Sequence, residues 1–169
     1  MKELIRDIAV ALVIVLVLTS IIKPTIVKES SMEPTLYENH YLIVNKIAYK
    51  TGEPERGDII VFESELETEE GDKKLLIKRI VGLPGETVTV TDGEVYIDGQ
   101  LLDEDYLKDG ITPGEITDCK VPDGQLFVMG DNRVVSIDSR ELGCIGEETV
   151  MGKAVVRLFP FNQIGGLYK

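Results

Sequence analysis

An apolar run in the middle of the chain places a lysine where its amine could act as a base. Lys78 has Leu76 and Ile80 two positions to either side. In a strand these three side chains share one face, while Ile77 and Arg79 point to the opposite face, where the guanidinium can stay hydrated. Burial would lower the pKa of the lysine from about 10.4 to near 7 or 8, and such an amine can accept a hydroxyl proton. Read alone, the run also fits a surface lysine at a strand edge.

Ser31 carries the hydroxyl that such a base could activate. Pro34 has a fixed φ and favours an extended conformation at Glu33, so the backbone here can hold Ser31 rigidly. His40, the one histidine of the sequence, lies in a polar stretch and is predicted to be a solvated turn residue. A serine activated by histidine and aspartate would need His40, whereas a serine paired with a lysine base is a known variant that does without it.

Four segments, taken in order, resemble the successive sequence boxes of bacterial type I signal peptidases. They are residues 31–36, 56–62, 78–86 and 130–140, the last through Gly-Asp-Asn-Arg at 130–133 and Ser-Ile-Asp-Ser-Arg at 136–140. The resemblance implies a membrane-anchored serine endopeptidase that removes N-terminal signal peptides from secreted preproteins after small residues. Ser31 would be its nucleophile and Lys78 its general base.

The same resemblance assigns supporting residues around this pair. The Ser136 hydroxyl would hydrogen-bond the lysine nitrogen and steer it. Asp138 and Arg140 would form a salt bridge that holds their loop against the site. Asp131 and Arg133 would be structural in a similar way.

Two places depart from a common pattern of that family. Glu29 stands two positions before the nucleophile, where some relatives have a serine that donates a hydrogen bond to the oxyanion, and an ionised carboxylate cannot donate. We therefore expect the Ser31 backbone N–H to be the main oxyanion donor, with Ser30 as one substitute for the second. Val134 and Val135 stand where many relatives carry polar residues, which predicts a more apolar loop.

Substrate selection should follow from the size of a cleft lined by aliphatic side chains. Such a cleft admits alanine and rejects bulky groups, although one methylene is worth only about 1–3 kcal/mol of discrimination. Five residues are predicted to line it from their positions relative to the catalytic pair, and as plain core residues they would look no different: Val27, Met32, Leu36, Leu76 and Ile77.

Composition limits the functions that remain. The net charge of −12 argues against a nucleic-acid partner, because phosphate contacts need clustered lysine and arginine. The acidic stretch at residues 63–72 lacks the ligand spacing of a metal loop and is predicted to be a solvated loop between strands, so neither metal nor cofactor is expected. Cys119 and Cys144 lack metal-ligand spacing and fit a disulfide, two free thiols or two core residues equally well.

The N-terminal segment is predicted to contact the lipid bilayer. Residues 8–22 are apolar except for two hydroxyl residues, and as a helix they would span about 22 Å against a hydrocarbon core of roughly 30 Å. No cleavage pattern of a signal peptide follows, so we expect an uncleaved single anchor, with Arg6 and Lys23 snorkelling at its ends. The family resemblance implies a cytoplasmic N-terminus, a cell-membrane location and a catalytic domain on the extracytoplasmic side, in proximity to the secretion translocon.

The rest of the chain is predicted to be mainly β, a coiled antiparallel sheet or barrel-like domain. Asp-Gly pairs at 92–93 and 98–99 indicate tight hairpins. The expected organisation is an anchor at residues 1–24 and a β-rich catalytic domain at residues 25–169, with one convincing helix. The predicted strands are residues 41–44, 58–62, 75–81, 87–90, 95–97, 126–129 and 154–158.

Two other functions compete with signal-peptide removal. A self-cleaving regulator can also pair serine with lysine in a β-rich domain, but it predicts a DNA-binding module where this chain has an apolar segment. A non-catalytic, membrane-anchored β domain would retain the sequence boxes and fail to react with a serine-directed probe.

Overall fold

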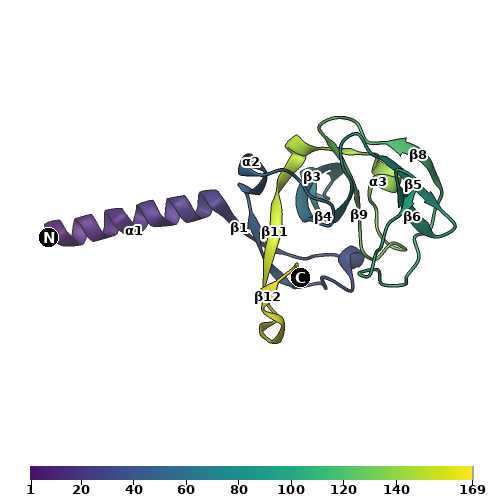
Figure 1. Ribbon diagram of the computed structural model, residues 1–169. Coiled ribbons are helices and arrows are strands. Elements are labelled where there is room, and N and C mark those ends of the chain that lie inside the picture. Colours follow the sequence, from purple (N-terminus) through teal and green to yellow (C-terminus); the bar gives the residue numbers. More distant parts are fainter. Residues whose placement is uncertain (169) are drawn as a thin grey trace.

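Helix α1 (Lys2–Ile21) projects away from a β-rich body in the computed structural model, which describes residues 1–168 (Figure 1). None of its side chains is buried against the body. Its 20 residues span about 30 Å at 1.5 Å per residue. The predicted 15-residue helix was too short, because helical hydrogen bonding continues through the charged residues of the first turns. Judged by length and composition, α1 is the one helix in residues 1–168 that could cross a membrane.

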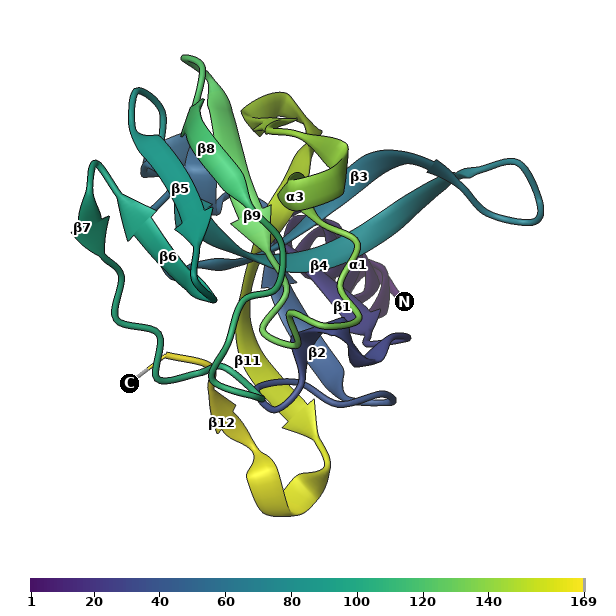
Figure 2. The ribbon, with the colours of Figure 1, turned by 90° about the vertical axis from the view of Figure 1, so that its right-hand side faces the viewer.

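The larger sheet has eight strands and follows the order β1-β2-β11-β3-β4-β9-β10, with β12 beside β11. All of its recorded pairings are antiparallel. Its longest hairpin, β3–β4, extends beyond the body in Figure 2. The strands are β1 (Ile22–Ile26), β2 (Tyr41–Asn45), β3 (Ile59–Glu67), β4 (Lys73–Gly82), β9 (Gln125–Met129), β10 (Ile145–Gly146), β11 (Val150–Phe159) and β12 (Gly165–Gly166).

A smaller antiparallel sheet of four strands packs at one side of the body, in the order β7-β6-β5-β8. Its hairpin turn at Asp92 and Gly93 has positive φ at both residues, as the sequence pattern predicted. The strands are β5 (Thr87–Thr91), β6 (Glu94–Ile97), β7 (Gln100–Leu101) and β8 (Ile116–Lys120). The remaining helices are short: η1 (Ser30–Met32), α2 (Ala48–Thr51), α3 (Ser139–Leu142), η2 (Glu147–Thr149) and η3 (Phe161–Gln163).

The predicted fold class is confirmed, since the chain is mainly β with antiparallel sheets and one long N-terminal helix. The predicted loop at residues 63–72 is wrong for half of its length. Strand β3 continues to Glu67 and β4 starts at Lys73, so only the residues between them form a turn. Acidic side chains on the solvated arm of a hairpin can still be backbone-paired, which their composition did not reveal.

Three apolar clusters stabilise the body. One lies between the smaller sheet and the ends of β4 and β9, where Cys119 and Cys144 pack as free thiols. A second lies beneath η1, and a third lies on the face that β3 and β4 share with β9. The third cluster positions the site, because its members flank the lysine of β4: Ile60, Phe62, Leu76, Ile80, Leu126 and Val128.

Candidate active site

Ser31 and Lys78 meet at the junction of η1 and β4. The Lys78 Nζ atom lies 2.7 Å from Ser31 Oγ, within hydrogen-bonding distance. The lysine is 1% exposed and the serine 7% exposed, so this contact is shielded from water. Glu33, just beyond η1, is extended as Pro34 requires, with φ −67° and ψ 142°.

The strand face that carries Lys78 explains its burial. Leu76 and Ile80 lie on the same face of β4, and Ile60 of β3 stands directly opposite the lysine in the register. All three side chains are buried and apolar. An ammonium group in these surroundings loses hydration, and no carboxylate of residues 1–168 forms an ion pair with it.

Burial is the main cause of the altered proton affinity of Lys78. It lowers the pKa of the amine from an ordinary 10.5 to about 8. The negative charges of Asp138 and Glu29 oppose this change and raise the pKa, whereas the positive charges of Lys74 and Arg140 lower it further. At pH 7, one unit below this pKa, about a tenth of the amine is therefore uncharged and can accept a proton, far more than for an ordinary lysine.

Asn132 fixes the backbone of the serine. Its backbone N–H donates to the Ser31 carbonyl at 3.0 Å, and its side-chain Nδ2 donates to the Ser30 carbonyl at 3.2 Å. Gly130 makes a close approach in the same place, because a Cβ on it would lie 2.5 Å from the Ser31 carbonyl oxygen. The sequence analysis assigned no role to Asn132, although this residue lies in the fourth family segment at residues 130–140.

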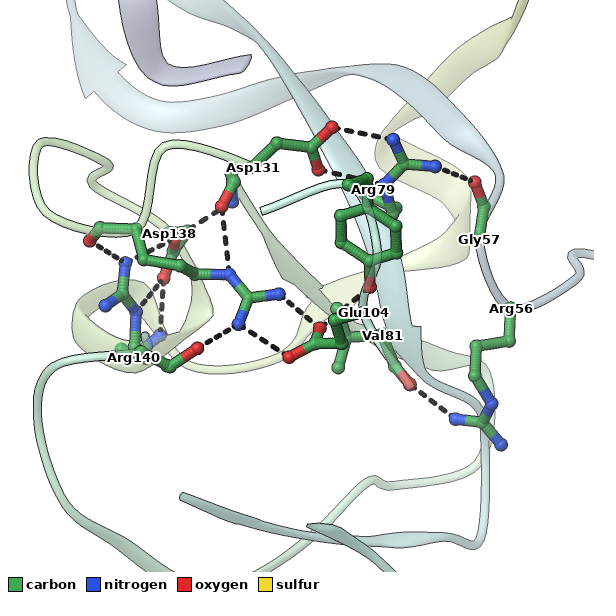
Figure 3. Close-up of polar contacts among 12 residues, drawn as sticks. Arg56, Gly57, Arg79, Val81, Glu104, Asp131, Asp138 and Arg140 are labelled. Atoms are coloured by element: carbon green, nitrogen blue, oxygen red, sulfur yellow. Dashed lines mark hydrogen bonds and ion pairs between the residues drawn. The ribbon is translucent and has the colours of Figure 1, made fainter. Parts of the chain in front are cut away.

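Arg79 is buried, which corrects the expectation that it would stay hydrated. It is 7% exposed and forms two hydrogen bonds with Asp131, at 2.8 and 2.6 Å (Figure 3). It also donates to the Gly57 carbonyl at 2.9 Å and stacks on the ring of Tyr106, 4.0 Å from the centroid. Asp131 in turn accepts a hydrogen bond from Thr35 at 2.5 Å. This network ties β4 to the loop that carries Asn132.

Asp138 and Arg140 form the ion pair that the family resemblance implied. Arg140 donates to both Asp138 oxygens at 2.9 Å, and the Gly130 N–H donates to Asp138 at 3.0 Å (Figure 3). Burial alone would raise the pKa of Asp138, but the hydrogen bonds and charge of Arg140 bring it below its ordinary value. Asp138 is fully enclosed and the Arg140 side chain is only 11% exposed, so the pair is more than a weak surface contact. Arg133 is also buried and pairs with Glu104.

Ser136 lies in the same loop and is 5% exposed. Its hydroxyl has no hydrogen-bond partner within residues 1–168, so the contact with the Lys78 nitrogen is not formed in this conformation. The Ser136 side chain does lie beside Gly130, next to the carbonyl of Ser31. Its steering role stays a prediction.

His40 is buried rather than solvated, contrary to the expectation from its polar neighbours. It is 5% exposed, and its Nδ1 accepts a hydrogen bond from the Tyr37 N–H at 3.2 Å. Burial, together with the charge of Arg157, lowers its pKa. The hydroxyl of Ser31 has Lys78 as its recorded partner instead, so no serine-histidine pair is assembled among the described residues.

A cavity of about 470 Å³ opens beside Ser31 between two strand edges. The first edge is that of β1, the terminal strand of the larger sheet, and of the residues that continue it to Glu29. The second edge is that of residues 73–77 of β4, which do not pair with β9. Four of the five predicted lining residues lie on its wall: Val27, Met32, Leu76 and Ile77. Leu36 does not line it, because it is fully buried in the cluster beneath η1.

Glu29 forms an ion pair with Lys74 at 2.5 Å across this region, and both side chains are partly exposed. As a carboxylate it supplies no oxyanion hydrogen bond. Within residues 1–168, no three histidine, cysteine, aspartate or glutamate side chains are grouped so that they could hold a metal ion.

An antiparallel β body that holds a serine hydroxyl against a buried amine, beside an open apolar cavity, has the architecture of a peptidase. Comparison with known proteins leads to the same class. The family model described as "Signal peptidase, peptidase S26" matches residues 1–159. The chain belongs to this family, and its similarity to bacterial signal peptidases I extends over most of its length.

Individual relatives support that assignment. The probable signal peptidase I-2 of Synechocystis sp. is 43% identical over 141 residues, which cover 82% of this chain and 64% of that protein. The signal peptidase I of Bacillus licheniformis is 38% identical over 175 residues, which cover 96% of this chain and 90% of that protein. The crystal structure of a signal peptidase I from Enterococcus faecalis has a TM-score of 0.52 and 36% identity, and the match covers 60% of this chain and 97% of that one.

Proposed function

We propose that this protein is a membrane-anchored serine endopeptidase that removes signal peptides from secreted preproteins, with Ser31 as nucleophile and Lys78 as general base. The observation that carries the proposal is the 2.7 Å contact between Lys78 Nζ and Ser31 Oγ in an apolar environment. Membership of the signal peptidase family supports the substrate class.

The proposed reaction uses one base for both halves. The neutral Lys78 amine accepts the Ser31 hydroxyl proton as Oγ attacks the scissile carbonyl carbon. The resulting ammonium returns a proton to the departing amine nitrogen, and an ester to Ser31 remains. Water then attacks this ester while Lys78 accepts its proton, and the serine oxygen leaves with a proton from the lysine. The Ser31 backbone N–H is the proposed oxyanion donor, and losing such a donor costs about 3–4 kcal/mol.

The position of the large cavity suggests how the substrate is held. An extended peptide can pair with unpaired strand edges, and here two such edges face each other across the cavity. In an extended chain alternate side chains point the same way, so the residue before the scissile bond and the one two positions earlier would enter the apolar hollow. A narrow aliphatic hollow next to the nucleophile favours small residues there.

The direction of the substrate follows from helix α1. Strand β1 begins directly at the end of α1, and the large cavity runs along β1 from Lys23 to Glu29. We propose that α1 spans the bilayer, because it is apolar and long enough and none of its side chains is buried against the body. A signal peptide held in the same bilayer would then reach the site along β1, with its N-terminal side nearest the membrane. The catalytic domain would lie outside the cell membrane, close to the translocon that delivers preproteins.

We propose residues 1–24 as the anchor and residues 25–169 as the catalytic domain. Strand β1 already starts at Ile22, so the last residues of the anchor segment also take part in the larger sheet. The catalytic site is therefore joined to the membrane segment through paired backbone rather than through a free linker.

Cleavage of a synthetic preprotein tests the proposal. Ser31→Ala and Lys78→Ala should each abolish cleavage while the circular dichroism and thermal unfolding of the domain remain cooperative. Thr117→Ala is the control, at an exposed hydroxyl outside the large cavity, and should retain activity. Retained cleavage in either catalytic variant would refute the assignment, and failure of a serine-directed probe to label Ser31 in folded protein would favour a non-catalytic domain.

A further inference from the structure

A second cavity of about 280 Å³ adjoins Ser31. It shares Glu29, Ser31, Lys74 and Leu76 with the large cavity but leads away from β1. Its remaining wall is formed by Ser30, Glu38, Leu66, Val135 and Ile137. The sequence departs from its family's pattern at Glu29 and at the pair Val134 and Val135. Glu29 and Val135 both line this cavity, so both departures contribute to it.

The charges of the second cavity are unbalanced. Glu29 and Lys74 are paired at 2.5 Å and neutralise each other. Glu38 is exposed on the wall and takes part in no ion pair within residues 1–168. The lining therefore carries one uncompensated negative charge, beside a site where a substrate would pass.

Apolar side chains stand close to that charge. Val135 is 55% exposed and Ile137 is 45% exposed, and both belong to the loop that follows Asn132. Leu66 contributes from the β3–β4 hairpin. A lysine or arginine side chain matches this combination, because its methylene stem covers apolar surface while its head group remains at a wet carboxylate.

The substrate direction assigns an occupant to the second cavity. This step rests on the proposed function: if the signal-peptide side lies along β1 in the large cavity, the chain beyond the scissile bond leaves Ser31 on the other side. That segment is the start of the mature protein. Its first side chains are the ones that would meet Glu38, Val135 and Ile137.

We propose that the second cavity is a subsite for the first residues after the scissile bond, and that Glu38 makes it select basic over acidic side chains. Val135 and Ile137 hold the stem of the basic residue. A carboxylate of the substrate is repelled by Glu38 and has Lys74 already occupied by Glu29.

The expected selectivity is modest, because Glu38 is solvent-exposed. An exposed ion pair changes kcat/KM by a factor of about 2 to 5. Attraction raises kcat/KM for a lysine substrate and repulsion lowers it for a glutamate substrate. The ratio of the two kcat/KM values should therefore reach about 10. Salt at 1 M, where the screening length is about 3 Å, should reduce this ratio to near 1.

A peptide series measures the effect directly. Synthetic preprotein peptides keep alanine before the scissile bond and carry lysine, glutamine or glutamate at one of the first three positions after it. With the full chain in detergent at low ionic strength, kcat/KM should fall from lysine to glutamine to glutamate at one of those positions. Glu38→Gln should make the three peptides equivalent, and Glu38→Lys should invert their order.

The control is Glu115→Lys, at an exposed carboxylate outside both cavities, which should leave the order of the wild type unchanged. Equal kcat/KM values for all peptides in an enzyme that still rejects a bulky residue before the scissile bond would overturn the subsite alone. The same order in the wild type and in Glu38→Lys would overturn it as well. No cleavage of any peptide would overturn the proposed function together with the subsite.

Discussion

The Lys78 amine has an environment that fixes when it can work as a base. Burial brings its pKa to about 8, and the amine is uncharged above that pH. The neighbouring charges partly cancel, since Asp138 and Glu29 raise the pKa while Lys74 and Arg140 lower it. The burial of the strand face is thus the dominant influence on the chemistry.

Activity should follow the titration of this amine. Below pH 8 the ammonium form predominates and cannot accept the serine proton, so kcat/KM should rise about tenfold per pH unit and level off above pH 8. Rates of preprotein cleavage between pH 6 and 10 measure this. A midpoint near 10.5, the value of an ordinary lysine, would show that the amine is not desolvated in solution.

The same burial should cost stability at low pH. The pKa is about 8 in the folded chain and 10.5 when unfolded, so below pH 8 both states are protonated and the folded state holds a buried charge. Between pH 8 and 10.5 only the unfolded state keeps its proton, and stability rises with pH across this window. Lys78→Met should therefore increase the free energy of unfolding by about 3 kcal/mol at pH 6 and much less at pH 10.5, as measured by denaturant titration. A destabilised variant at pH 6 would contradict this.

Among the elements, the loop after β9 does the positioning. Its Asn132 binds the backbone of η1, its Asp131 binds Arg79 of β4, and its Asp138 binds Arg140 at the start of α3. The contacts of Asp131 and Asp138 are ion pairs, and those of Asn132 are hydrogen bonds to backbone carbonyls. The serine and the lysine come from different elements, and this loop is the part that joins both.

Gly130→Ala tests the positioning of η1. The added methyl group would clash with the Ser136 side chain and would lie 2.5 Å from the Ser31 carbonyl oxygen, so both the loop and the backbone of the nucleophile must shift. A displacement of about 1 Å at a reacting group lowers the rate by roughly 100-fold, which is the expected loss in kcat/KM. Gly165→Ala is a matched control in β12, where an added Cβ meets open space, and should leave the rate unchanged. Wild-type activity in Gly130→Ala would show that η1 adapts freely.

For the molecule as a whole, helix α1 is the proposed membrane anchor. It buries no side chain against the body, and it continues directly into β1 beside the large cavity. An apolar helix without protein partners is stable in lipid, where its backbone groups are already paired.

Vesicle flotation tests this arrangement. The full chain should float with vesicles of neutral phosphatidylcholine at both low and high salt, because the proposed attraction is apolar and therefore insensitive to screening. A variant lacking residues 1–21 should remain in the dense fraction yet cleave a soluble peptide at a similar rate. Flotation of the truncated variant would assign membrane contact to the β body instead.

The linear pattern of residues predicted seven of the twelve strands in residues 1–168, the long apolar helix and the proposed catalytic pair, but it missed β1, β7, β8, β10 and β12. Strand alternation placed Lys78 among apolar neighbours, and the four boxes identified the family, because both depend on residues close together in the chain. Sequence also predicted Asp138 with Arg140, which are two positions apart.

Only the folded arrangement decided which charges are buried and which apolar side chains face a cavity. Arg79 is enclosed because Asp131, far along the chain, supplies its counter-charge. Leu36 lies beneath η1, although Val27 and Met32 of the same apolar cluster line the large cavity. The second cavity likewise unites Glu29, Glu38 and Val135 from separate segments. Burial and pairing depend on contacts between elements distant in sequence, and a local pattern of residue types does not contain them.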